Sequence, residues 1–355
     1  MRKLDALLAT LLLAPALSAQ QLPLFTDGTA FGGSRLFSQG LNPLGNPARF
    51  SPRSGGQLPG FYGTYLTGGL EAVDFRKRLD AWVATPSEVT LKPLAEAPWG
   101  LRTTAVGLAL LEEAGHLSLT RETTTSLLAG PDLDAARLGT GWPQNTSTLE
   151  VRRSMVERLV YGLVSVEGGT AMGLSLRVER WTLGQRVHGV HPAGSQLPLL
   201  VPGADPYDFE ETSLRTTAST LDAGLTMELG TGLRIGVQAD RLVPRTIQGV
   251  EEKTQVRAGL QLDLGQQARL SLEGDVNSAA RMPYPVKQKA LAASLVFQVN
   301  PSVTFRVGSE RRTYGDLSTT RTGATLSIQT PGFVLGVGFQ VGADQPLRGA
   351  MLRVY

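Results

Sequence analysis

The alternation of apolar and polar residues between positions 254 and 275 constrains the fold of this chain more than any other feature. From 256 to 264 every second residue is apolar, and charged side chains such as Arg257 and Asp263 lie between them. A period of two is typical of a β-strand whose two faces differ. The pattern restarts after residues 265–267, so this segment predicts a hairpin with a short turn.

The charges on the polar face of this hairpin raise the question of which face points inward. The chain is 18% charged and 41% apolar, a composition that excludes wholesale disorder. A soluble sheet turns its apolar face inward, whereas a membrane barrel places that face in lipid and the polar face in a lumen. After residue 20 no apolar run is long enough for a spanning helix, so only a barrel could carry this chain across a membrane.

The same alternation recurs along the chain and predicts an all-β fold. We expect a transmembrane antiparallel β-barrel of about fourteen strands, with twelve as the nearest alternative, and one short helix over 71–83. The predicted strands are 58–67, 99–111, 116–126, 151–166, 170–183, 213–229, 233–243, 254–264, 268–275, 287–299, 303–312, 319–329, 333–341 and 347–355.

Loop lengths provide an independent argument for the barrel. The predicted connections after the even-numbered strands are tight, and those after the odd-numbered strands are mostly longer. The longest are 68–98, 127–149 and 184–211. Outer-membrane barrels have short periplasmic turns and long outer loops, whereas a soluble sandwich has no reason to sort its loops in this way.

The first nineteen residues have the form of a secretory signal peptide. Arg2 and Lys3 precede an apolar core over 7–17, and small residues follow up to Ala19. We therefore expect export to the outer membrane of a Gram-negative-type bacterium, and the absence of cysteine fits an exported protein. The expected divisions of the chain are a signal peptide, an N-terminal plug or hatch segment and the barrel, at 1–19, 20–57 and 58–355.

The segment 20–57 has regularly placed aromatic residues but no strand period. Because these side chains would be costly to leave in water, we expect the segment to be ordered against the inner wall of the barrel. The aromatic residues are Phe25, Phe31, Phe37 and Phe50.

The same segment carries a family resemblance. Gly32 and Gly33, followed by Asn46, Pro47 and Ala48, resemble the N-terminal signature of the fatty-acid-transport (FadL-like) outer-membrane barrels. These five residues are taken as the plug motif.

Later segments carry a second resemblance. Four of them are similar to successive strands of the plasmid-transfer TraF-type outer-membrane proteins, and the chain is also similar to PorV-type barrels. The four segments are 241–245, 255–260, 271–275 and 303–308. These resemblances imply an outer-membrane barrel, and the FadL-like one implies a protein that binds or moves small hydrophobic molecules.

Candidate catalytic and metal-binding residues are few. The chain has three histidines, and His188 and His191 lie three apart in a predicted loop rich in glycine and proline. This spacing is non-specific, so we favour a solvated loop over a metal site. The sequence has no Gly-x-Ser-x-Gly motif, and we expect no enzyme activity, no cofactor and no metal. The small net charge of +3, with basic and acidic residues interleaved, argues against a nucleic-acid partner.

If the leucine-rich faces meet lipid, the lumen receives many charges of both signs. Opposite charges on neighbouring strands can pair, so we expect a rigid barrel that lacks the apolar lining of a fatty-acid path. The candidate ligand or lumen residues are Arg234, Asp240, Arg257, Asp263, Arg269, Glu273, Asp275, Arg306 and Glu310, and Gln238, Arg312 and Arg321 share their face.

The sequence favours two functional hypotheses, and an outer-membrane hydrolase is a third. The first is a barrel that binds or transports small hydrophobic molecules across the outer membrane. The second is a non-transporting structural or docking barrel of a secretion, conjugation or surface-assembly apparatus, which the charged lumen favours. The expected partners are outer-membrane lipid and either a small hydrophobic ligand or a protein of a secretion apparatus.

Overall fold

The computed structural model describes most of the predicted strands and small parts of the remaining chain. The described residues are 36–37, 46–49, 60–69, 77–78, 81, 84–85, 89–90, 99–112, 115–129, 148–189, 214–247, 250–281, 284–314, 317–330, 333–341 and 347–354. The expected signal peptide lies outside them. Of the helix expected over 71–83, Lys77, Arg78 and Ala81 are described and are helical. In the described part of the chain, no helix is long and apolar enough to cross a bilayer.

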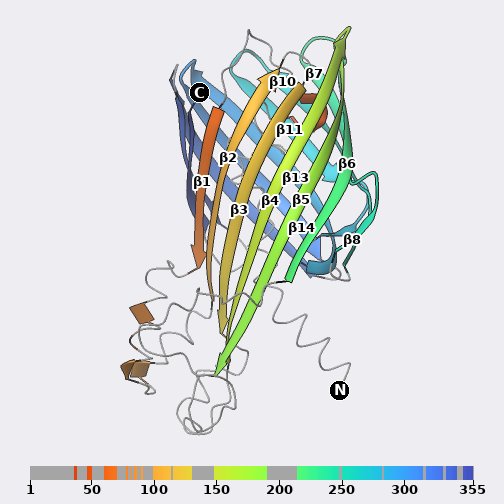
Figure 1. Cartoon of the computed structure of the whole chain (residues 1–355). Helices are drawn as coiled ribbons and strands as arrows, with labels where there is room; N and C mark the ends of the chain where they lie inside the picture. Colours follow the sequence, from red (N-terminus) through yellow and green to blue (C-terminus); the bar gives the residue numbers. More distant parts are fainter. Residues whose placement is uncertain are drawn as a thin grey trace.

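The chain forms one closed antiparallel ring of strands (Figure 1). The large sheet has fifteen strands, of which the short β12 pairs only with β13, so fourteen make the ring. The ring is closed by pairing of β1 with β17 and of β11 with β13. The strands of the ring, with the short ones between them, are β1 (Gly60–Gly69), β2 (Trp99–Glu112), β3 (Gly115–Ala129), β4 (Thr148–Glu167), β5 (Thr170–Gly189), β6 (Leu214–Glu228), β7 (Leu233–Asp240), β8 (Arg245–Ile247), β9 (Val250–Glu252), β10 (Gln255–Leu264), β11 (Ala268–Asp275), β12 (Ala279–Arg281), β13 (Tyr284–Asn300), β14 (Val303–Tyr314), β15 (Leu317–Gln329), β16 (Phe333–Val341) and β17 (Leu347–Val354).

The fourteen strands predicted from the alternation are confirmed in number and order. The main differences lie at strand ends, because β4 and β5 are each twenty residues long. The strand β5 continues to Gly189 and therefore includes His188, which the sequence had placed in a loop.

The two faces of the ring have the distribution expected of a membrane barrel. On β10, Leu260, Leu262 and Leu264 are exposed on the outside, whereas Arg257 and Gln261, at positions of the opposite parity, are buried in the lumen. The other long strands repeat this pattern, with exposed leucine, valine and phenylalanine outside and buried polar residues inside. This arrangement is the reverse of a soluble sheet and matches the period of two in the sequence.

The connections are sorted between the two ends of the barrel. At one end, here called the turn end, β2–β3, β4–β5, β6–β7, β10–β11, β13–β14 and β15–β16 are joined by tight turns. The glycines 168, 169, 230, 232 and 265 in three of these turns have positive φ, which favours glycine. The opposite end, the loop end, carries the long connections, although β14 and β15 are separated there by two residues and β16 and β17 by five.

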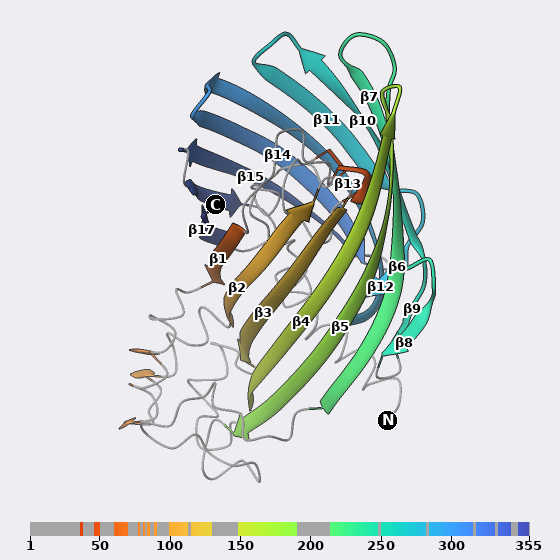
Figure 2. The ribbon, with the colours of Figure 1, turned by 45° about the horizontal axis from the view of Figure 1, so that its top comes forward.

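Three neighbouring strands stop short of the loop end. β7, β10 and β11 have 8, 10 and 8 residues, whereas β6 and β13 on either side have 15 and 17. The place beyond the short strands is occupied by the hairpin of β8 and β9 and by β12, which contact β6 and β13 (Figure 2). Within the chain, this hairpin is the connection between β7 and β10.

Two described parts of the expected plug segment lie inside the barrel. Leu36 and Phe37 are buried, and the short 3₁₀-helix η2 (Pro47–Arg49) contacts β4, β5 and β6. The rest of the segment, including Gly32, Gly33 and the other three phenylalanines named above, is outside the described residues.

Replacing Leu260 by lysine tests which face meets lipid. Leu260 is at the middle of the outward row of β10, so we expect Leu260→Lys to lower the free energy of unfolding by about 2–4 kcal/mol. The matched control, Leu264→Lys, makes the same change on the same face beside the tight turn, where the cost should be about 0–1 kcal/mol. Urea unfolding of the protein in lipid vesicles measures both values, and equal costs would contradict the assigned membrane depth.

Candidate functional site: a charged lumen with an apolar patch

The lumen side of β3, β4 and β5 carries a row of buried charges. The Arg158 guanidinium on β4 binds two carboxylates, Glu122 on β3 at 2.5 Å and Glu179 on β5 at 2.9 Å. Both partners come from neighbouring strands and point inward because each has the parity of its polar face. The guanidinium also lies 5.8 Å from the centroid of the Trp181 ring, within the range of a cation–π contact.

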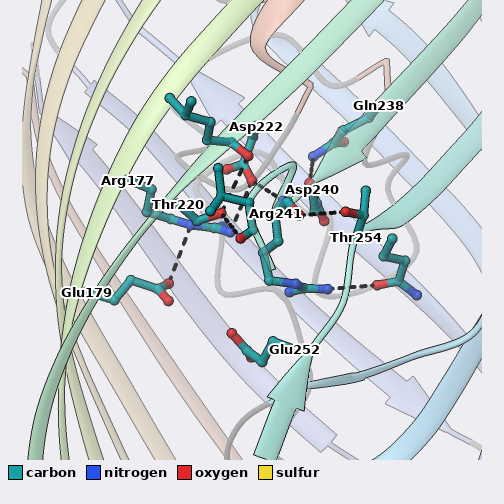
Figure 3. Close-up of polar contacts among 12 residues, drawn as sticks. Arg177, Glu179, Thr220, Asp222, Gln238, Asp240, Arg241, Glu252 and Thr254 are labelled. Atoms are coloured by element: carbon teal, nitrogen blue, oxygen red, sulfur yellow. Dashed lines mark hydrogen bonds and ion pairs between the residues drawn. The ribbon is translucent and has the colours of Figure 1, made fainter. Parts of the chain in front are cut away.

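Glu179 is the carboxylate on which three guanidinium groups converge. Besides Arg158, it contacts Arg177 at 3.6 Å and Arg245, which is the first residue of β8. Arg177 in turn binds Asp222 on β6 at 3.2 Å (Figure 3). The side chain of Glu179 is almost fully buried, so the arginines provide the compensation that a buried carboxylate needs.

The β8–β9 hairpin is held to the lumen wall by this cluster. Arg245 binds Glu179 and also Glu252 of β9, the latter at 2.7 Å, and donates to the Ala218 carbonyl of β6 at 3.5 Å. One arginine therefore joins both strands of the hairpin to two strands of the wall.

The inner side of the hairpin carries two apolar residues beside its two charged ones. Ile247 and Val250 are buried and form one cluster with Val156 of β4 and Trp181 of β5. These four residues, the lumen apolar patch, are joined by the partly buried Leu183, Ala218 and Ala280. The lumen therefore holds a small apolar cluster whose members are buried against one another.

The chain enters the hairpin through a left-handed residue, Arg241. Its φ is 58°, a conformation that side-chain-bearing residues rarely adopt. Its amide donates to Asp222 Oδ1 at 2.7 Å, its side chain donates to the Lys253 carbonyl at 3.3 Å, and its carbonyl accepts from Thr254 Oγ1 at 2.8 Å. Figure 3 shows Asp222 and Thr254 beside Arg241. The contacts fix the direction in which the hairpin leaves the wall.

A second charge cluster lies on β10 and β11. Arg257 binds Glu273 at 2.9 Å and Asp275 at 2.8 Å. Asp275 also accepts a hydrogen bond from the Ala290 amide of β13 at 2.8 Å, and Glu273 accepts one from the Leu36 amide at 2.9 Å. This cluster therefore connects the plug segment to the wall of the barrel.

Charges at the turn end form a third group, and two charges on β14 form a pair of their own. Arg234 binds Glu228 at 3.0 Å and Asp263 at 3.5 Å, and Asp263 is also 3.5 Å from Arg269. On β14, Arg312 binds Glu310.

The described part of the plug motif, residues 46–48, is packed directly on the backbone of the wall. Asn46 Nδ2 lies 3.3 Å from the Leu225 carbonyl and 3.4 Å from the Val237 carbonyl, and its Oδ1 accepts from the Ala48 amide at 3.0 Å. A methyl group at Gly224 would lie 1.8 Å from Asn46 Oδ1, so glycine is needed there for the plug motif to approach the wall.

The candidate residues predicted from sequence fall into these groups. Arg257, Glu273 and Asp275 belong together, as do Arg234, Asp263 and Arg269, while Glu310 pairs with Arg312. Asp240 is buried in the lumen and accepts a hydrogen bond from Gln238, and the half-buried Arg306 alternates with the exposed Phe305 on β14. Their functional role remains a prediction.

The most extensive cluster was not among the predicted site residues. The alternation in the sequence of β5 puts Arg177 and Glu179 on its polar face, and this pattern could have identified them as lumen residues. Arg245 and Glu252 gave no such signal, because they belong to a connection whose inward direction is set by tertiary contacts.

Comparisons with known proteins bear on the fold. No family model matches the chain, and no curated protein matches its sequence. The toluene transporter TodX of P. putida has a TM-score of 0.57 at 7% identity, over 94% of this chain and 97% of that one. The toluene transporter TbuX of Ralstonia pickettii has a TM-score of 0.53 at 10% identity, over 94% and 98%. The CymD monoaromatic hydrocarbon channel gives 0.53 at 10% identity, over 95% and 97%. The chain shares the barrel fold of these channels.

Neutralising Glu179 tests the charge cluster. Arg158 and Arg245 keep Glu122 and Glu252 as partners, so we expect Glu179→Gln to lower the free energy of unfolding by about 3 kcal/mol, the low end for a broken buried ion pair. Glu157→Gln is the matched control, since Glu157 is an outward-facing partner of Arg180 at 3.9 Å and its loss should cost about 0–1 kcal/mol. Urea unfolding in vesicles compares the two variants. A cost below 1 kcal/mol for Glu179→Gln would refute its central role.

Proposed function

We propose that this protein is an outer-membrane β-barrel that binds small hydrophobic molecules and moves them across the outer membrane. The observation that carries the proposal is the lumen apolar patch, which gathers Trp181, Val156, Ile247 and Val250 in an interior whose buried residues are mostly polar. An apolar surface with a few oriented polar groups is the usual lining of a small-molecule site.

The ligand class follows from the size and chemistry of the patch. The tryptophan ring and the three branched aliphatic side chains are buried against one another, so a ligand has to enter between them, which limits it to a single aromatic ring or a short alkyl group. The Arg158 guanidinium stands beside the ring of Trp181. Several solved barrels of the same fold are described as transporters of toluene or channels for monoaromatic hydrocarbons, which supports this class.

The location and family also belong to this proposal. Export by a signal peptide at 1–19 and insertion with the loop end outside agree with the sorted connections. Resemblance to the FadL-like barrels supports a hydrophobic ligand and a non-enzymatic role. The finer TraF-type and PorV-type assignments rest on strand patterns alone.

A structural or docking barrel is the second candidate. The ion pairs that join β3, β4, β5, β6 and the β8–β9 hairpin across the loop end of the lumen favour it, because they hold the interior in one arrangement. A partner from a secretion apparatus would then be expected at the loops rather than in the lumen.

Uptake of radiolabelled toluene by cells that produce the protein separates the two candidates. We expect uptake above that of cells without it, and a fall on the order of 10-fold for Trp181→Gln, since losing the contact of a large apolar side chain corresponds to about 1.5–3 kcal/mol. Thr182→Gln, on the opposite face of the same strand, is the matched control and should leave uptake unchanged. Uptake equal to that of the empty cells would favour the structural role.

A further inference from the structure

A group of cations faces outward at the loop end of β13 and β14. Lys287, Lys289 and Arg311 are all exposed, and the two lysines share the parity of Leu291, which is 65% exposed on the lipid side. The register places Arg311 opposite Leu291 and Thr313 opposite Lys289. Arg311 is therefore a diagonal neighbour of Lys289 on the outer surface, and the three residues form one patch, here called the cation trio.

The cation trio has no acidic partner among the residues that the structure describes. Arg311 donates to the Ser318 hydroxyl at 3.5 Å, and its outward neighbours on β14 and β15 are serine and threonine. No ion pair is formed within the described chain by Lys287, Lys289 or Arg311, so the patch keeps a charge of about three.

The opposite wall shows how this chain otherwise treats outward charges. On β3, β4 and β5, Arg121, Glu157 and Arg180 lie in one register row, and Glu157 is 3.9 Å from Arg180. There the positive charges flank a carboxylate. The cation trio lacks such a residue, which makes it suited to an anion from outside the chain.

The surroundings of the cation trio indicate what kind of anion fits. On the side towards the turn end, the outward face continues with the exposed apolar residues Leu291, Leu295 and Phe305. A ligand that covers both surfaces has an anionic headgroup and acyl chains. Arginine and lysine are the side chains that bind phosphate groups, and basic clusters beside a membrane's apolar core attract anionic lipids.

We propose that the cation trio is a binding site for the phosphate-bearing headgroup of a glycolipid of the lipid A type in the outer leaflet. The proposal rests on the proposed function, because it takes the loop end to be outside in an outer membrane. In that orientation the trio lies where the headgroups of the outer leaflet meet the barrel. The lipid bound there holds β13, the strand that closes the ring with β11, at a defined depth.

Binding of lipid A to the purified protein in neutral detergent tests the site. Native mass spectrometry should detect lipid A on the wild type, and dephosphorylated lipid A should bind at least 10-fold less, on the order expected for loss of two or more surface charge contacts. The triple variant K287Q, K289Q and R311Q should lose binding to the same extent. The matched variant R121Q and R180Q, which removes two outward cations from the opposite wall, should bind within about twofold of the wild type.

Several outcomes would overturn the proposal. Equal binding by the triple variant and the wild type would show that the cation trio is not the site, and displacement by millimolar inorganic phosphate alone would show a phosphate site rather than a lipid site. Both variants are first checked for the faster gel migration of an unheated folded barrel, which separates lost binding from lost folding. Toluene uptake is measured in parallel on the wild type and on the same triple variant. Toluene uptake by a wild type that binds no lipid A would refute the lipid site alone. Lipid A binding by a wild type that takes up no toluene would refute the proposed transport alone.

Discussion

Closure of the ring is the constraint on which the rest of the structure depends. In hydrocarbon an unpaired backbone amide or carbonyl costs several kcal/mol, so a sheet can cross a membrane only when its last strand pairs with its first. Here β11 reaches β13 over seven register pairs, from Ala268 to Gly274. Because β7, β10 and β11 are short, this pairing ends before β6 and β13 do, and the remaining edges must be satisfied in another way.

The connections that follow β7 and β11 meet that need. The Leu242 amide donates to the Leu221 carbonyl of β6, the Asp275 carboxylate accepts from the Ala290 amide of β13, and β12 adds a short pair of its own to β13. The β8–β9 hairpin therefore lies against the lumen face of the wall, fixed by Arg241 and Arg245. Its charges and its apolar side chains are then both inside, where the ion pairs around Glu179 frame the lumen apolar patch.

The sequence predicted the ring because its signal is local. Alternation with a period of two appears on each strand separately, and a single residue of slip would reverse both faces, so the inward position of Arg257, Glu273 and Asp275 follows directly from the pattern. The plug motif came instead from the resemblance to the FadL-like barrels, and the structure places its Asn46 against Gly224 of the wall.

The hairpin could not be predicted in the same way. Residues 241–254 carry three-residue strands, too short for a period to appear, and Arg241 adopts a left-handed conformation that only its tertiary contacts explain. Trp181 lies on the polar face of β5, because it has the same parity as Arg177 and Glu179. Its contact with Ile247 and Val250 could be predicted only from the position of the hairpin. Long-range pairing decides that direction, and composition does not reveal it.

The inward position of the β8–β9 hairpin is the central claim, and cysteine accessibility tests it most directly. The chain has no cysteine, so Ile247→Cys and Glu251→Cys each supply a single thiol on opposite faces of the same hairpin. Ile247 is 0% exposed, whereas the Glu251 side chain is 61% exposed. With a membrane-impermeant maleimide added to intact cells, the account predicts rapid labelling at 251 and none at 247 until the protein is unfolded. Equally rapid labelling at both positions would contradict it, because the hairpin would then extend into solvent and the lumen apolar patch would not exist.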